Sequence, residues 1–156
     1  MKIKWKPLII SVAIPLLVGG ISALLTRNSM QTFDEISKPP LSPPGWLFPV
    51  VWTILYTLMG IASYLVLTAK VPMGDKKLPL IIYAAQLAVN FFWSIFFFNF
   101  ELYLFSFIWL VLLWLLIIAT IVLFYRISKP AALLLVPYLL WVTFAGYLNF
   151  AIYLLN

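Results

Sequence analysis

The sequence predicts an all-α membrane protein, a bundle of five transmembrane helices with a proline-rich loop between helices 1 and 2. The first observation is composition: of 156 residues, 65% are apolar and 9% are charged, and the mean hydropathy is +1.12. Ten Lys and Arg residues with four Asp and Glu residues cannot cover the surface of a soluble domain of this size. The second observation is that five apolar stretches are each long enough to cross about 30 Å of hydrocarbon.

These stretches occupy most of the chain. They are continuous apolar runs, whereas the strands of a membrane barrel alternate apolar and polar residues, so they predict helices. The segments between them are too short for a further domain, and we expect residues 1–156 to form one domain. The predicted helices are about 8–25, 47–67, 78–98, 102–124 and 131–155.

Basic residues are distributed unevenly among the connections. Arg27 and Lys38 lie in the segment between the first two stretches, and all the others lie on the opposite side. The positive-inside rule therefore puts the N-terminus in the cytoplasm and the C-terminus outside. Lysines before an apolar block also describe a signal peptide, but this block is longer than the apolar region of one, and we expect it to be retained. The eight residues on the cytoplasmic side are Lys2, Lys4, Lys6, Lys70, Lys76, Lys77, Arg126 and Lys129.

Missing residue types exclude much familiar chemistry. The chain has no Cys and no His, so disulfides, thiolate nucleophiles, imidazole bases and the usual zinc or haem ligands are absent. Four acidic residues leave little room for another metal site, and we expect no metal and no required cofactor. No basic run is long enough to follow a phosphate backbone, so the expected partner is the lipid bilayer and not nucleic acid.

The connection over residues 26–45 is the longest loop. Four prolines fall within residues 39–44, and they fix the backbone and remove hydrogen-bond donors. One interpretation is a stiff, extended cover over a pocket in the bundle. The alternative is that the prolines only end the flanking helices, with Pro44 near the first turn of the second one.

Small residues recur every four positions in the first predicted helix, at Ser11, Pro15, Gly19 and Ala23. Such a stripe lets two helix backbones approach closely, and close packing is its expected role. The predicted helix 102–124 has almost no polar side chains. We expect it to be the most lipid-exposed helix or an oligomer face.

Three other helices each combine large rings with small, proline or amide residues on one face. Trp52, Trp93 and Trp141 lie inside their spans, whereas Trp5, Trp46 and Trp109 are expected in the interfacial aromatic belt. The inner rings either pack between helices or line a cavity suited to a large, planar, mostly apolar molecule. The polar members likewise either bond between helices or face that cavity. The three faces are Pro49, Trp52, Tyr56 and Gly60; Gln86, Asn90, Trp93 and Phe97; and Pro137, Trp141, Ala145 and Asn149.

These spaced residues resemble the signature of the tryptophan-rich sensory protein and translocator protein family (TspO/MBR), also called the peripheral-type benzodiazepine receptor family. The resemblance extends over nearly the whole chain in register. The residues that show it are Lys38-Pro39, Pro43-Pro44, Phe48, Trp52, Leu55-Tyr56, Met59-Gly60, Tyr64-Leu65-Val66, Gln86, Asn90, Trp93, Pro137-Tyr138, Trp141, Phe144-Ala145 and Leu148-Asn149.

The resemblance implies a five-helix membrane receptor or sensor, often a homodimer. It implies binding of porphyrins, such as protoporphyrin IX, and of drug-like aromatic molecules in a pocket covered by the first loop. Trp52 and Trp141 match two tryptophans linked in some relatives to light-dependent breakdown of protoporphyrin IX. Carried over by position, the ligand-binding residues are Pro43, Trp52, Tyr56, Asn90, Trp93, Trp141 and Ala145.

Three functions follow as hypotheses: a porphyrin receptor, an enzyme that degrades porphyrin through Trp52 and Trp141, and a porphyrin transporter. Arg27 and Lys38 are the candidate partners of the porphyrin propionates, being the basic residues on the loop side. The helices contain neither buried ionisable residues nor an evident inverted repeat, which speaks against coupled transport.

Two departures from the family pattern limit what carries over. The first loop reads Thr32-Phe33 where relatives commonly have Trp-Tyr. The C-terminal pattern associated with cholesterol is broken after Tyr153, so sterol binding is not predicted.

Overall fold

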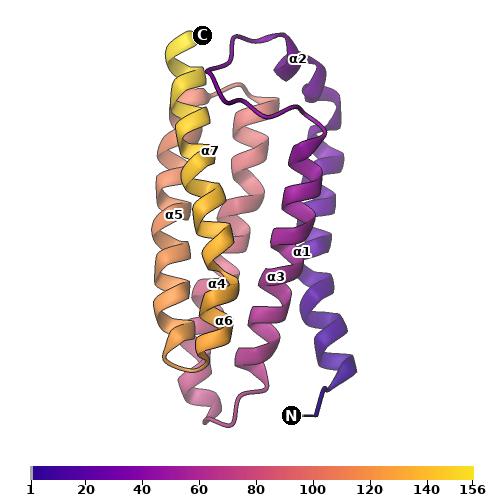
Figure 1. Cartoon of the computed structure of the whole chain (residues 1–156), viewed down its shortest axis with the longest axis vertical. Coiled ribbons are helices and arrows are strands. Elements are labelled where there is room, and N and C mark those ends of the chain that lie inside the picture. Colours follow the sequence, from indigo (N-terminus) through magenta and orange to yellow (C-terminus); the bar gives the residue numbers. More distant parts are fainter. Residues whose placement is uncertain (1) are drawn as a thin grey trace.

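The protein is a bundle of long helices that stand side by side, as seen in a computed structural model that describes residues 2–156 (Figure 1). Five helical segments are long and apolar enough to cross a membrane. No strand occurs among residues 2–156. The predicted fold class is confirmed, and the chain is an integral, multi-pass membrane protein.

The observed helices follow the predicted spans with changes at their ends. In chain order they are α1 (Trp5–Thr26), a 3-10 turn η1 (Arg27–Ser29), α2 (Met30–Glu35), α3 (Leu47–Leu67), α4 (Met73–Ser94), a π-helical segment η2 (Ile95–Asn99), α5 (Tyr103–Tyr125), α6 (Lys129–Leu134) and α7 (Val136–Leu155).

Two boundaries differ from the prediction for identifiable reasons. The helix expected at 78 begins at Met73, because its charged first turn is helical although too polar for a hydropathy window. Within that turn the Lys76 ammonium donates a 2.7 Å hydrogen bond to the Leu67 carbonyl at the end of α3. The helix expected over 131–155 is divided at Leu135, since Pro137 has no backbone N–H and stands in the first turn of α7.

Helix α1 packs closely on α3 through small residues, as the stripe predicts. A Cβ atom added to Gly60 of α3 would lie 2.4 Å from the Val12 Cα and 2.7 Å from the Ser11 carbonyl oxygen. A Cβ added to Gly19 of α1 would lie 2.2 Å from the Tyr56 ring. Only glycine therefore allows this approach at both positions, and the close-packing prediction is confirmed.

Of the two alternatives for residues 102–124, the most lipid-exposed helix is wrong, and an oligomer face stays a prediction. In its most apolar window, α1 has 17% of its residues buried, against 28% for α5. Helix α5 packs on α4, α6 and α7 and buries Leu110, Leu113 and Ile117 along one face. Helix α1 instead lies at the edge of the bundle and contacts mainly α3 (Figure 1).

The loop between α1 and α3 crosses the end of the bundle that lies opposite the N-terminus (Figure 1). Its first part is helical, in η1 and α2, so an extended path begins only at Ile36. Hydrogen bonds fix the loop to other elements: Tyr147 on α7 donates to the Pro40 carbonyl at 2.9 Å, and the Asn156 amide bonds both backbone groups of Ser37. These hydrogen bonds hold the loop over this end of the bundle.

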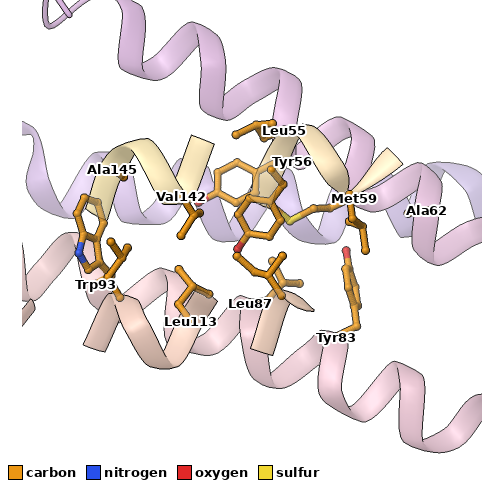
Figure 2. Packing of buried hydrophobic residues seen from close by; sticks show 14 of the residues in the cluster. Leu55, Tyr56, Met59, Ala62, Tyr83, Leu87, Trp93, Leu113, Val142 and Ala145 are labelled. Atoms are coloured by element: carbon orange, nitrogen blue, oxygen red, sulfur yellow. The ribbon is translucent and has the colours of Figure 1, made fainter. Parts of the chain in front are cut away.

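Polar side chains inside the bundle bond to one another between helices. The Tyr56 hydroxyl donates to the Asn90 side-chain oxygen at 2.8 Å, and the Asn90 amide donates to the Tyr138 hydroxyl at 2.7 Å. Tyr138 in turn donates to the Gln86 oxygen at 2.6 Å. Apolar residues surround this chain of bonds; Figure 2 shows Trp93 and Ala145 at one end of the cluster and Tyr83 at the other. The interpretation that Gln86 and Asn90 form hydrogen bonds between helices is therefore confirmed.

Candidate functional site

A cavity of about 500 Å³ lies beneath the loop, between α1, α3, α4 and α7. Its volume falls in the range of about 300 to 1,000 Å³ that is typical of small-molecule sites. Aromatic rings make up much of the wall. The lining residues are Gly19, Ser22, Ala23, Thr26, Arg27, Met30, Asp34, Gly45, Trp46, Phe48, Pro49, Trp52, Tyr56, Trp93, Ser94, Phe98, Trp141 and Ala145.

Trp52 is held by contacts with two tyrosines. It stacks on Tyr56 of the same helix, with ring centroids 5.4 Å apart and planes inclined by 28°. It also meets Tyr138 of α7 edge to face at 6.2 Å. Because the Tyr56 hydroxyl is bonded to Asn90, the stacked pair is fixed in position at the cavity wall.

The other two inner indoles come from different helices. Trp93 of α4 donates its N–H to the Asn149 oxygen at 3.0 Å and is buried. Trp141 of α7 meets Phe48 edge to face at 6.0 Å. Among residues 2–156, no hydrogen-bond acceptor pairs with the indole N–H of Trp52 or of Trp141. Both residues line the cavity.

The cavity opens at its rim between the end of α1 and the start of α3. The inner wall is buried or half-buried, whereas the rim is exposed. Arg27 contributes a cation to this rim and Asp34 contributes a carboxylate. Asp34 lies next to Gly45. The exposed rim residues are Ala23, Arg27, Asp34, Trp46 and Pro49.

The comparison with known proteins identifies the family. The model of the TspO/MBR family matches residues 11–155. This chain belongs to the TspO/MBR family.

Named relatives cover this TspO/MBR protein almost end to end. It is 41% identical over 150 residues to the tryptophan-rich protein TspO of Chlorobaculum tepidum, which covers 96% of this chain and 95% of that protein. It is 42% identical over 138 residues to protein CrtK of Rhodobacter capsulatus, covering 88% and 85%. It is 34% identical over 148 residues to the translocator protein of Bos taurus, covering 94% and 88%.

The structure of this TspO/MBR protein brings most of the predicted binding residues together. Trp52, Tyr56, Trp93, Trp141 and Ala145 all line the cavity, although they come from three helices. Of the two candidate propionate partners, Arg27 lies at the rim. The binding role of these residues stays a prediction.

Three predicted residues lie elsewhere. Pro43 lines a much smaller void of about 20 Å³ under the loop, beside Trp93 and Ala145. Asn90 stands behind Tyr56, with its oxygen and its amide bonded to two tyrosine hydroxyls. The Lys38 ammonium donates to the carbonyls of Phe33 and Asp34 at 2.9 and 3.1 Å, so it caps the C-terminal end of α2. Lys38 does not line the cavity.

Sequence reasoning missed several lining residues of the TspO/MBR cavity. Trp46 is exposed, as an interfacial residue would be, but it also stands at the mouth. Asp34 and Met30 come from α2, a helix too short to be recognised from the sequence. One signal was present: the small-residue stripe of α1 continues through Ala23 to Thr26 on the same helix face.

Trp109 contacts a neighbouring helix, and its place in the interfacial belt stays a prediction. Its indole N–H donates to the Val89 carbonyl at 2.7 Å, and its ring meets Phe96 edge to face at 5.1 Å. It therefore joins α5 to α4. Trp109 does not line the cavity of this TspO/MBR protein.

The cavity offers aromatic rings, one cation and one carboxylate. Among residues 2–156, no group of three or more His, Cys, Asp or Glu residues is placed to hold a metal ion. The arrangement is suited to binding a flat, mostly apolar molecule whose polar groups reach the rim.

Proposed function

We propose that the protein is a membrane receptor or sensor that binds porphyrins, such as protoporphyrin IX, and other hydrophobic aromatic ligands in this cavity. The observation that supports the proposal is the convergence of four tryptophans on one space of about 500 Å³: Trp52, Trp93 and Trp141 from three helices, and Trp46 from the turn before α3. A flat π-system gains most from such a wall, at about 0.5–1.5 kcal/mol for each aromatic contact beyond burial.

The polar edge of a porphyrin fits the open rim. Its two propionates would extend between α1 and α3 toward Arg27, whose guanidinium can bond a carboxylate in a bidentate manner. The carboxylate of Asp34 at the same rim disfavours a second anion close to it. We therefore expect one propionate at Arg27 and the other in solvent.

The free porphyrin is favoured over haem. The chain has no His and no Cys to ligate iron, and the Tyr56 hydroxyl is committed to Asn90. The Met30 thioether on the lining is a weak ligand by itself. Binding should accordingly depend on ring stacking and not on the metal.

Titration of the purified protein with protoporphyrin IX tests the proposal. We expect saturable quenching of tryptophan fluorescence and a shifted Soret band at micromolar pigment. Trp52→Phe should reduce the quenching, whereas Trp5→Phe, at the opposite end of the bundle, should not. Absence of a saturable change in the wild-type protein would refute porphyrin binding.

Light-dependent degradation of the bound porphyrin is a second candidate. It is favoured by one observation: Trp52 and Trp141, whose indole N–H groups have no partner among residues 2–156, line the same cavity as the proposed pigment. Either indole would then lie within reach of the excited macrocycle.

We propose that the N-terminus is cytoplasmic, which puts the cavity and its cover on the outside, and that the protein forms a homodimer. Since the chain has no Cys, single cysteines introduced at Lys70 and Ser37 can be labelled in cells with a membrane-impermeant maleimide. Labelling should occur at residue 37 only. Chemical crosslinking in membranes at varied expression levels tests the dimer.

A further inference from the structure

Helix α1 gives the cavity beneath the loop a side that differs from the rest of its wall. The rings of the lining come from other elements, among them Trp52 on α3 and Trp141 on α7. The lining residues of α1 are small or carry a hydroxyl, and their spacing of three and four positions puts them on one helix face. They are Gly19, Ser22, Ala23 and Thr26. A ligand therefore lies against small and hydroxyl-bearing side chains where it faces α1.

The hydroxyl of Ser22 is a buried group without a partner. Ser22 is 4% exposed, and no side-chain hydrogen bond joins it to another of residues 2–156. Within the same residues, the unpaired hydroxyls that are sealed from any contact are those of Tyr83 and Ser106, and the Ser22 hydroxyl is not one of them. Its accessible part therefore faces the cavity that Ser22 lines. A ligand that covered this group without bonding to it would leave a buried polar atom unsatisfied, which costs free energy.

The other buried polar groups of the lining are bonded within the protein. The Thr26 hydroxyl donates to the Ser22 carbonyl at 2.9 Å. The Tyr56 hydroxyl and the Trp93 N–H each donate to the side-chain oxygen of an asparagine. Ser94 is only half-buried, so an unpaired hydroxyl costs less there. Ser22 is thus the position where a ligand oxygen gains most from a hydrogen bond.

Ser22 lies below the charged rim of the cavity. It precedes Arg27 by five residues, which is about 7.5 Å along the helix axis. Arg27 is exposed, whereas Ser22 is buried. A ligand with a carboxylate at Arg27 therefore brings an inner part of its ring system to Ser22, where a second charge would be costly.

The edge of a porphyrin can bond to the Ser22 hydroxyl only through an acceptor. The N–H groups of a porphyrin point to the middle of the macrocycle, so the substituents on its edge determine whether a hydrogen bond forms. A vinyl group has no oxygen. A formyl or ketone oxygen accepts from a hydroxyl, carries no charge and needs no donor in return.

We propose that Ser22 is a specificity-determining residue of the cavity and that its hydroxyl donates to an uncharged carbonyl oxygen of the ligand. The cavity then prefers a flat, acidic molecule with a carbonyl group on its inner edge over one with a hydrocarbon group there. The inference rests on the proposed function, since it concerns the same cavity, and it defines the class of ligand more narrowly.

Two porphyrins of nearly the same shape test this preference. One is protoporphyrin IX, and the other is its analogue with formyl groups in place of both vinyl groups. The ratio of their affinities is measured for each protein by quenching of tryptophan fluorescence, so that differences in solubility between the porphyrins cancel when variants are compared. Ser22→Ala should reduce the preference for the diformyl porphyrin by about five-fold relative to the wild type, the effect of one hydrogen bond.

Ser11→Ala is the matched control. Ser11 is a buried serine on the same helix, and it does not line this cavity. Its substitution should leave the ratio of affinities at the wild-type value. An equal ratio in the wild type and in Ser22→Ala would overturn the proposal, as would the same loss of preference in both variants.

Resonance Raman spectra of the bound diformyl porphyrin give a second measurement that does not depend on affinity. A hydrogen bond lowers the stretching frequency of a formyl C=O group. One formyl band should therefore lie lower in the wild-type protein than in dichloromethane, and this shift should be lost in Ser22→Ala and kept in Ser11→Ala. Two unshifted bands in the wild-type protein would overturn the role of Ser22 alone. Failure of both porphyrins to bind would refute the proposed function, and this inference with it.

Discussion

The indole N–H of Trp93 on α4 donates a 3.0 Å hydrogen bond to the Asn149 oxygen on α7. The Asn149 amide donates onward to the Tyr103 carbonyl at the start of α5, at 2.7 Å. A single buried side chain thus joins three helices and fixes one ring of the proposed binding wall. Trp93 can therefore present only its ring, and not its N–H, to a ligand.

Replacing Asn149 with Leu should destabilise the protein by about 1–3 kcal/mol, because the Trp93 N–H and the Tyr103 carbonyl would both lose a partner. The measurement is the apparent unfolding free energy in detergent titrations with SDS. Asn28→Leu is the matched control, since Asn28 is exposed. Equal stability of the two variants would show that the bonds add nothing.

Replacing Gly60 with Ala should separate α1 from α3. The added methyl group would meet backbone atoms of Val12 and Ser11, which cannot rotate away, and such overpacking costs about 1–3 kcal/mol. Since α1 forms one wall of the cavity, porphyrin affinity should fall as well. Gly20→Ala is the control, because its added Cβ meets no atom within 4 Å. The melting temperature should drop in the Gly60 variant alone.

Lys38 and Arg27 should differ in their effects on ligand binding. Lys38→Met removes the hydrogen bonds that cap the end of α2. We therefore expect faster proteolysis of the loop and an unchanged salt dependence of porphyrin binding. Arg27→Gln should instead weaken binding by about two- to five-fold and reduce its salt dependence. The opposite pattern would indicate that the propionate contacts Lys38 and not Arg27.

The sequence predicts the bundle well because lipid imposes a uniform rule on each span. Long apolar runs have to be helical in a bilayer, and the stripes place Trp52, Trp93 and Trp141 on inner faces. It does not predict the local contacts of each ring. Trp109 and Trp46 occupy similar positions near span ends, yet one is bonded to the Val89 carbonyl and the other stands at the cavity mouth.

The loop shows a second limit of sequence reasoning. Its charge and proline content indicate a cover, but they do not reveal that residues 27–35 are helical. Lys38 is drawn to the carbonyls at the end of α2, a partner that exists only after that short helix forms. Arg27, in the turn before α2, stays at the rim. Two basic residues that look equivalent in the sequence therefore occupy different environments.

Trp52 and Trp141 distinguish a receptor from a photochemical enzyme. Replacing either with Phe keeps an aromatic ring at the wall and removes the indole, so porphyrin affinity should change by no more than about tenfold. If the protein degrades bound pigment, the loss of Soret absorbance under constant illumination should slow strongly in both variants, compared at equal fractional occupancy. Trp5→Phe, remote from the cavity, should degrade pigment at the wild-type rate. A wild-type protein that binds porphyrin and leaves it intact in light is a receptor without this activity. If affinity and pigment loss fall in proportion, the two indoles act only as a binding surface, because a chemical role requires a change in rate at fixed occupancy.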